Sequence, residues 1–368
     1  MDKKNQRPEF HGSDLEKIAA YYHIPASEIP GIIKFGANVN PLGLSESVKN
    51  DLAGHLDIIS SYPDRNYTSL KKTIGEYCHI SPEHIVVGNG STELISLLIS
   101  QRQAKKALVV GPTYSEYERE LALTGGTITE YNLKEDLNFQ LDMQDFFASM
   151  ADDVDLLILC NPNNPTSSAI KNHDMKQILT FCKERNIFVM IDETYVEFAP
   201  DVAEITAIPL TDEFDNVMVI RGVSKFYAAP GLRFGYGITS NHDFLEALLI
   251  HQNPWSLNSV AAYAGEHMFK DHAYQQATRQ LICSERGRMY TAIQNMPAFK
   301  AYKPYANFIL VRILKEGLSS FDVFEAAIKE HMMIRDCSSF KSLDGEYIRF
   351  CIMNPEDNTH LLKLLEQF

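Results

Sequence analysis

The chain has 368 residues, which is enough for one large domain or two of ordinary size. Hydrophobic residues make up 45% of it and charged residues 22%, a mixture that provides an ample core and excludes a disordered, fibrous or low-complexity protein. The formal net charge of -14 argues against nucleic acid or an anionic membrane surface as the main partner.

The sequence lacks the signals of membrane-spanning, secreted and metal-binding proteins. No apolar run approaches the ~20 residues of a membrane-spanning helix, and the opening residues MDKKNQRPEF lack the apolar segment of a secretory signal. Six cysteines are scattered without a CxxC pair or a Cys/His cluster, so neither a disulfide framework nor a metal site is expected. We therefore expect a cytoplasmic protein.

Short apolar runs alternate with helical patterns along most of the chain. Six runs are predicted to be strands: HIVVG (84–88), KALVVG (106–111), DLLILC (155–160), NIFVMID (186–192), NVMVIR (216–221) and FGYGIT (234–239). They are continuously apolar, which is typical of strands covered by helices on both faces. Helical stretches such as 91–100 and 173–185 lie between them, so the sequence predicts an α/β fold with a mostly parallel sheet.

The pattern changes after about residue 270. A long helical stretch is followed by NFILVRI, a helix, MMIRDC, YIRFCI and a final helix, which indicates a smaller α+β domain. We expect an N-terminal segment (1–40) packed on that small domain, a large domain (41–270), and the small C-terminal domain itself (271–368).

Polar residues follow several of the predicted strands, at the edge where open α/β sheets bind their ligands. Gly88, Asn89, Gly90 and Ser91 lead into a helix whose N-terminus could receive an anion, although a tight turn with Ser91 as N-cap explains them equally well. NPNNPTSS (161–168) is either an Asx turn or a ligand-binding loop.

Two buried strands end in charged residues. Asp192 and Glu193 follow NIFVMI, so at least one carboxylate needs a partner: a structural arginine, a backbone amide or a cationic ligand atom such as a protonated ring nitrogen. Lys225 follows NVMVIR, and a lysine that forms a Schiff base needs a partly desolvated site that lowers its pKa. A lone lysine is more often a solvated charge, but the neighbouring Tyr227 and Arg233 favour the functional interpretation.

Eight collinear motifs span nearly the whole chain. They are ANVNPLG (37–43), YPD (62–64), GNGSTE (88–93), PTY (112–114), NPNNPT (161–166), DETY (192–195), SKFYAAPGLRFGY (224–236) and Arg349. In this order they resemble the fold-type I pyridoxal-phosphate enzymes, in the branch that holds histidinol-phosphate aminotransferase and threonine-phosphate decarboxylase. The resemblance implies pyridoxal 5'-phosphate as cofactor, bound by the large domain.

The resemblance also implies roles for single residues. Lys225 would bind the cofactor covalently and move protons, Asp192 would keep its ring nitrogen protonated, and Tyr114 would stack on its ring. The cofactor's phenolic oxygen is assigned to Asn164 and Tyr195. Its phosphate is assigned to Gly90, Ser91, Thr92, Ser224 and Arg233, with Tyr62 supplied by a second subunit, which implies a homodimer.

On the substrate side, Arg349 would bind the carboxylate, and Asn40 and Asn164 would line the pocket. Arg335 and His11 are candidates for a substrate phosphate, which needs several charge-assisted donors. Two residues depart from the family pattern: Gly222 stands where many relatives have a hydroxyl side chain, and Ser167 stands where a glycine is usual.

Five details resemble the threonine-phosphate decarboxylases more than the aminotransferases. They are HGSD (11–14), the Thr-Glu-Leu of GNGSTEL (88–94), KFYAAPGLR (225–233), NPWSLN (253–258), and IRDCSSF (334–340) followed by EYIRFCI (346–352). The implied reaction converts L-threonine O-3-phosphate into (R)-1-aminopropan-2-yl phosphate, a precursor of cobalamin. The alternative is an aminotransferase that acts on L-histidinol phosphate and 2-oxoglutarate. A regulator that binds pyridoxal phosphate without turnover is less favoured, because the N-terminal segment leaves no room for a helix-turn-helix.

Overall fold

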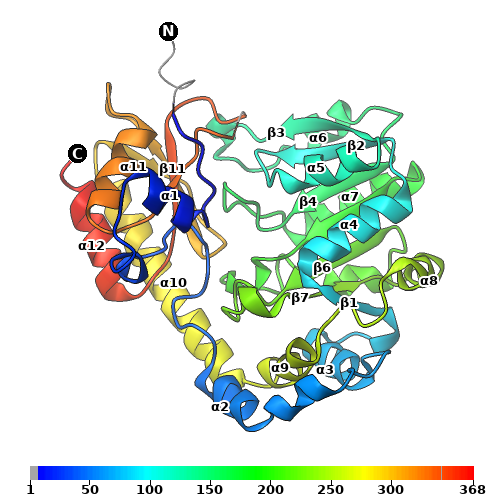
Figure 1. Cartoon of the computed structure of the whole chain (residues 1–368). Coiled ribbons are helices and arrows are strands. Elements are labelled where there is room, and N and C mark those ends of the chain that lie inside the picture. The colour runs from blue at the N-terminus through cyan, green and yellow to red at the C-terminus, as the bar shows by residue number, and fades with distance from the viewer. Residues whose placement is uncertain (1–6, 341) are drawn as a thin grey trace.

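The structure is a computed structural model of the chain and describes residues 7–340 and 342–368. Within these residues, seven strands form a central sheet in the order β1-β7-β6-β5-β4-β2-β3 (Figure 1). The strands are β1 (Ile85–Asn89), β2 (Lys106–Gly111), β3 (Thr127–Asn132), β4 (Leu156–Cys160), β5 (Phe188–Asp192), β6 (Val217–Gly222) and β7 (Phe234–Ile238). The sheet is parallel from β6 to β3, and β7 is antiparallel to both of its neighbours, which confirms the predicted α/β fold.

The six predicted strands are confirmed as β1, β2 and β4 to β7, whereas β3 escaped prediction. β3 lies at the edge of the sheet, and its sequence TITEYN is mostly exposed around one buried residue, Tyr131. An edge strand does not need the continuous apolar run of a central one. Residues 223–233, all of them described, connect β6 to β7 without an α-helix, and such a short connection requires antiparallel strands.

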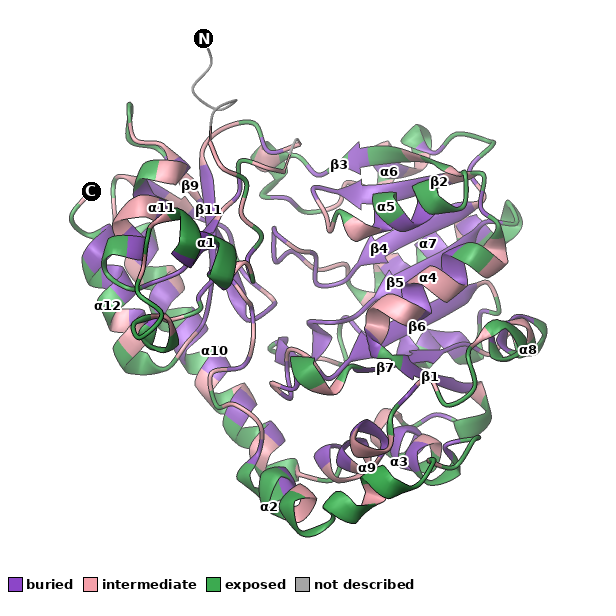
Figure 2. Cartoon of the chain, in the orientation of Figure 1, coloured by how far each residue is buried: buried purple, intermediate pink, exposed green. Residues whose placement is uncertain are grey.

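Helices cover both faces of the central sheet, so its strands other than the edge strand β3 are mostly buried (Figure 2). One face packs on α4 (Gly90–Arg102), α5 (Glu116–Leu123) and α8 (His242–His251). The other face packs on α3 (Thr68–Cys78), α6 (Met143–Ser149) and α7 (Asn172–Glu184). Alternate strand residues serve the two cores; in β1, for example, Val86 belongs to the first and Val87 to the second.

A second, antiparallel sheet forms in the described residues near the C-terminus, in the order β10-β11-β9-β8. Its strands are β8 (Phe299–Ala301), β9 (Phe308–Ile313), β10 (Arg335–Asp336) and β11 (Tyr347–Cys351), and its helices are α10 (His272–Gln294), α11 (Ser320–Lys329) and α12 (Pro355–Leu365). The predicted strand MMIRDC is shorter than expected, because Met332 pairs with Ile33 of the N-terminal segment and only Arg335 and Asp336 pair with β11.

The N-terminal segment, with α1 (Leu15–Tyr21), lies against this smaller sheet (Figure 1). Phe10 stacks on Phe324 of α11 with ring centroids 5.8 Å apart, and Arg7 pairs with Glu346 at 3.1 Å. These contacts support the expected packing of the segment, while the exact domain boundaries stay a prediction. The remaining helices, α2 (Glu46–Gly54) and α9 (Ser259–Met268), pack near α3. None of the helices in the described residues is long and apolar enough to cross a membrane.

Candidate active site

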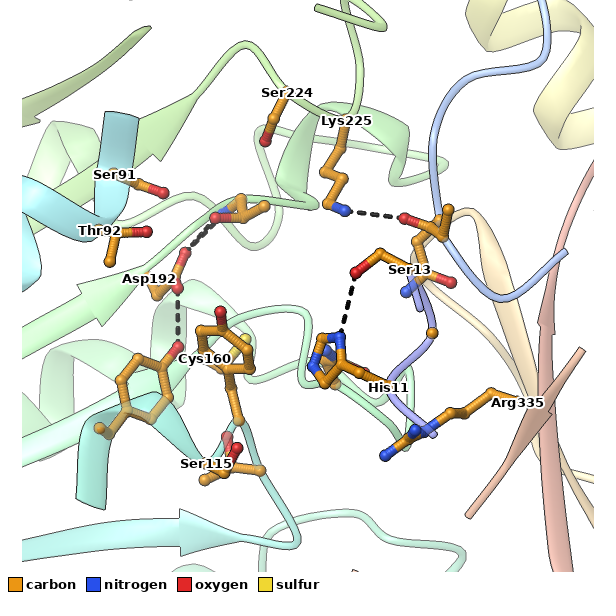
Figure 3. A pocket seen from close by; sticks show the side chains of 18 of the residues that line it. His11, Ser13, Ser91, Thr92, Ser115, Cys160, Asp192, Ser224, Lys225 and Arg335 are labelled. Atoms are coloured by element: carbon orange, nitrogen blue, oxygen red, sulfur yellow. Dashed lines mark hydrogen bonds between the residues drawn. The ribbon is translucent and has the colours of Figure 1, made fainter. Parts of the chain in front are cut away.

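A cavity of about 740 Å³ lies at the carboxyl ends of the central strands. Its walls come from the N-terminal segment, the loops after the central strands, and the smaller sheet (Figure 3). Most of the site residues expected from the sequence line it: His11, Gly90, Ser91, Thr92, Tyr114, Asn164, Asp192, Tyr195, Ser224, Lys225, Arg233, Arg335 and Arg349. The fold therefore brings together residues that are more than 300 positions apart in the chain.

Lys225 points into the cavity from the loop after β6 (Figure 3). Its Nζ donates a hydrogen bond to the carbonyl oxygen of Ala37 at 2.8 Å. Burial, together with the positive charges of Arg349 and Arg233, lowers the pKa of Lys225 to about 8. The amine is consequently neutral in a larger fraction of molecules near neutral pH than a surface lysine, as a nucleophilic amine requires.

Asp192 is the last residue of β5 and is 5% exposed. Tyr117 donates its hydroxyl hydrogen to Oδ2 at 2.7 Å, and Thr194 donates to Oδ1 through its backbone N–H at 2.9 Å and its hydroxyl at 2.5 Å. In the described part of the chain, all of the hydrogen bonds to this carboxylate come from neutral donors. The site can therefore still accept a cationic ligand atom.

The N-terminus of α4 and Arg233 together form an anion-binding corner. Gly90 begins α4 with φ +81°, and a Cβ built on it would lie 2.5 Å from Nη2 of Arg233. A Cβ on Gly235 would lie 2.4 Å from the backbone nitrogen of Ser91. The positive φ of Gly90 and the backbone contact at Gly235 favour glycine at both positions. The amides of α4 and the guanidinium group of Arg233 thus lie close together, an arrangement that suits an anion.

Both departures from the family pattern are accommodated. A Cβ at Gly222 would meet Oγ of Ser91 at 3.5 Å, an ordinary contact, so a hydroxyl side chain would fit there and its absence removes one donor. Ser167 has φ 59°, which explains the usual glycine. Its buried Oγ accepts a hydrogen bond from the backbone of Ala306 at 2.9 Å, which stabilises the serine in this conformation.

Two buried arginines lie side by side at the other end of the cavity. Arg335 in β10 and Arg349 in β11 are direct register partners, so their side chains share one face of the sheet, and they are 8% and 5% exposed. Arg349 bonds to Asn164 and donates to the carbonyl oxygen of Gly36 at 2.8 Å, and Arg335 donates to Oγ of Ser339 at 2.7 Å.

Part of each guanidinium group is left without a partner. Nη1 of Arg335 and Nε of Arg349 are buried and have no hydrogen-bond partner among the described residues. The nearby acidic residues Asp336 and Glu346 bind other groups: Asp336 accepts from Ser320, and Glu346 pairs with Arg7. Unpaired buried cations of this kind indicate a site for anionic groups.

His11 lies beside Arg335 in the same wall (Figure 3). Its Nδ1 is 3.3 Å from Oγ of Ser13. Partial burial and the positive charge of Arg335 lower the pKa of His11 below its usual 6.5. His11 thus meets a ligand mainly as a neutral ring at neutral pH, and it can donate or accept a hydrogen bond.

Two predicted site residues do not line the cavity. Asn40 is 2% exposed and uses its side-chain amide inside the protein, so its assignment to the substrate side is corrected. Tyr62 is 80% exposed and stacks on Trp255 with ring centroids 4.8 Å apart. Tyr62 is available to a neighbouring subunit, but its role there stays a prediction.

Three cavity residues were not identified from the sequence. Tyr117 and Thr194 hold Asp192, and Asn38 donates to the hydroxyl of Tyr195 at 3.4 Å. Tyr117 lies three residues after Tyr114 and Thr194 two residues after Asp192, so their spacing offered a signal. Asn38 belongs to the same motif as Asn40, and of these two residues Asn38 is the one that lines the cavity.

Comparison with known proteins identifies the family of the chain. A family model for aminotransferase class I and II matches residues 30–365. The chain belongs to this family. Within it, the chain is 34% identical over 355 residues to the threonine-phosphate decarboxylase of Salmonella typhimurium, covering 96% of this chain and 95% of that protein. It is 32% identical to an adenosylcobalamin biosynthesis bifunctional protein of Leptospira interrogans, over 96% of this chain and 40% of the relative.

A solved structure of another aminotransferase class I and II protein is also similar. The histidinol-phosphate aminotransferase from Clostridium acetobutylicum superimposes with a TM-score of 0.84 and 33% identity, covering 90% of this chain and 97% of that one. Enzymes of the family depend on pyridoxal phosphate. The residues present fit that molecule: the α4 corner suits its phosphate, the Lys225 amine its aldehyde, and the unpaired charge of Asp192 its ring nitrogen.

Proposed function

We propose that the chain binds pyridoxal 5'-phosphate and decarboxylates L-threonine O-3-phosphate to (R)-1-aminopropan-2-yl phosphate. The observation that carries the proposal is the pair of buried, incompletely partnered arginines, Arg335 and Arg349, on adjacent strands beside His11. A substrate with a phosphate and a carboxylate presents two anionic ends, whereas an ordinary amino acid presents one. The similarity to the Salmonella decarboxylase and to the cobalamin-biosynthesis protein supports the same reaction and pathway.

In this mechanism the residues of the chain bind and orient the cofactor and the substrate, and they transfer protons. Bound in the cavity, pyridoxal phosphate supplies a ring that accepts the electron pair released when a bond at the substrate α-carbon breaks. Asp192, held by Tyr117 and Thr194, keeps the ring nitrogen protonated. Lys225 holds the cofactor between turnovers, and its freed amine can then deliver a proton to the α-carbon that has lost carbon dioxide.

The two arginines set which bond at the α-carbon breaks. Which bond is cleaved would depend on how the protein anchors the two ends of the substrate. We assign the substrate phosphate to Arg335 and His11, and the carboxylate to Arg349. Holding the phosphate firmly at Arg335 and His11 would fix one end of the substrate, so that Arg349 could orient the carboxylate for its loss.

The second candidate is a histidinol-phosphate type aminotransferase. Its support is the 33% identity to the Clostridium enzyme, and a substrate phosphate would use the same Arg335. Incubation with threonine phosphate, with carbon dioxide and 2-oxoglutarate measured together, distinguishes the two. We expect carbon dioxide release without consumption of 2-oxoglutarate; amino transfer from histidinol phosphate without carbon dioxide release would establish the alternative.

We further propose a homodimer in which Tyr62 of each chain reaches the cofactor phosphate of its partner. The exposure of Tyr62 and Trp255 on the surface supports this arrangement. Tyr62→Phe should weaken cofactor binding, and mixing it with inactive Lys225→Ala should restore activity at limiting cofactor. Each hybrid dimer has one site with Lys225 from one chain and Tyr62 from the other. If hybrids are verified and no activity returns, Tyr62 does not act across the interface.

A further inference from the structure

The side chain of Asn40 lies where three segments of the chain meet. Its Nδ2 is 2.8 Å from the carbonyl oxygen of Phe226, 2.9 Å from the hydroxyl of Tyr274 and 2.8 Å from the hydroxyl of Thr278. Its Oδ1 accepts from the backbone of Leu42 at 3.1 Å. Every polar atom of this buried amide is therefore engaged inside the protein, and none is left for a substrate.

The same residue holds the loop that carries Lys225. The backbone N–H of Asn40 donates to the carbonyl oxygen of Lys225 at 3.1 Å, and its Nδ2 reaches the next carbonyl, that of Phe226. Two consecutive carbonyl groups are thus fixed by one residue, which sets the orientation of the peptide that follows Lys225 and hence the direction of its side chain.

The turn that contains Asn40 also contacts the far end of the lysine. Three residues before Asn40, the carbonyl oxygen of Ala37 accepts the hydrogen bond from Nζ (Figure 3). Segment 37–40 therefore contacts Lys225 at both its backbone and its amine. Among the described residues, no other segment forms hydrogen bonds to both ends of Lys225.

Tyr274 and Thr278 connect this arrangement to the rest of the molecule. Both lie in α10, the long helix that runs from the smaller sheet toward α2 (Figure 1). α10 packs against β8 and α12 of the smaller sheet. Asn40 consequently links the Lys225 loop to the helix that supports the wall with Arg335 and Arg349.

We propose that Asn40 is a positioning residue for Lys225, which fixes the lysine relative to the smaller sheet and does not bind substrate. The proposal rests on the proposed function only through the role of Lys225. A reacting amine must be placed to within a fraction of an ångström, and a displacement near 1 Å can reduce the rate about a hundredfold. Loss of Asn40 should therefore lower kcat and leave KM nearly unchanged.

Asn358 provides a matched control. It is fully buried in α12, its Nδ2 donates to Glu285 at 2.8 Å and to the Met353 carbonyl at 2.7 Å, and its Oδ1 accepts from Met353 at 2.9 Å. Asn358→Ala removes a buried amide with similar bonding from a place that does not contact the Lys225 loop. It should lower the melting temperature about as much as Asn40→Ala without affecting the site.

The test uses the holoenzyme and two readouts, the kcat and KM for threonine phosphate and the circular dichroism that the protein induces in the cofactor's visible band. Asn40→Ala should lower kcat by about tenfold to a hundredfold, change KM by less than about threefold, and reduce the induced dichroism. Asn358→Ala should leave all three values as in the unmodified protein. If Asn40→Ala does not fold, Thr278→Val, which removes one anchor on α10, should reduce the dichroism and kcat by a smaller factor.

Three results would overturn the proposal. Asn40→Ala, or Thr278→Val in its place, could show unchanged dichroism and kcat. KM could rise with kcat unchanged, which would make Asn40 a substrate ligand. Asn358→Ala could lower kcat and the induced dichroism as much as Asn40→Ala does, which would show that both effects come from a general loss of stability. Failure of the proposed function itself is visible separately, because the unmodified protein would then release no carbon dioxide from threonine phosphate, whereas the dichroism of Asn40→Ala would still report on the position of Lys225.

Discussion

Replacing Lys225 by alanine should abolish turnover and remove the visible absorption of covalently bound cofactor. No other group in the cavity wall offers a buried amine: Lys17, the other lysine among the described lining residues, lies in α1 and donates to the Glu9 carbonyl. The loss should remain at saturating cofactor, since binding without the covalent bond does not supply the amine that moves the proton. Absorption spectra before and after borohydride reduction, together with assays of carbon dioxide release, measure both effects.

Lys71 is a suitable control for this substitution. It lies in α3, outside the cavity wall, and burial lowers the pKa of its amine as well. Lys71→Ala should keep the absorption band and the rate, which would show that the effect belongs to the place of Lys225 and not to the removal of a desolvated lysine. Turnover by Lys225→Ala would refute the assignment of the cofactor to this lysine.

The second large effect is expected for Arg335→Ala. Arg335 is 8% exposed, its guanidinium group donates a hydrogen bond to Ser339, and its buried Nη1 has no partner among the described residues. Removing it should lower kcat/KM for threonine phosphate by a factor equivalent to about 2–5 kcal/mol, because the substrate phosphate would lose a buried charged partner. The spectrum of the bound cofactor should not change, since the α4 corner and Lys225 remain intact.

Two controls separate phosphate recognition from other effects of losing Arg335. The phosphate-free substrate, threonine, should react slowly with both proteins and show little change. Arg312→Ala removes an arginine of β9, a strand of the same sheet, that pairs with Glu135 and is about one-third exposed, so it should cost ~0–1 kcal/mol in stability and little in catalysis. If Arg335→Ala leaves kcat/KM unchanged, the proposal that two arginines bind the two anionic ends of the substrate loses its support.

The sequence predicted correctly the strands that are buried on both faces, because such strands have a continuous apolar run. β5 was predicted with its last residue, Asp192, and β6 with Lys225, which lies three residues beyond its end, because a charged residue at the end of a fully buried strand is unusual. β3 was missed because an edge strand exposes one side, and β10 was predicted too long because only two of its residues pair with a neighbour.

The site was predicted less well where the backbone direction is irregular. In a regular extended segment, residues two apart point the same way, so Asn38 and Asn40 could not be ranked by pattern. Asn38 has φ 56°, in the left-handed region, so the side chains diverge: Asn38 lines the cavity and Asn40 turns inward. Tyr117 was missed because it reaches Asp192 from a helix and does not follow a strand.

The antiparallel course of β7 limits how this protein can change in evolution. Gly222, at the end of β6, pairs with Gly235, and Asn89, at the end of β1, pairs with Phe234. The connection from 223 to 233, which carries Lys225 and Arg233, is thus fastened at both ends by ladder hydrogen bonds. An inserted or deleted residue there would separate the lysine from the anion-binding corner, whereas the helical connections between the parallel strands can absorb such changes on the surface. Functional homologues of this chain should therefore keep the length of this connection constant while other loops vary.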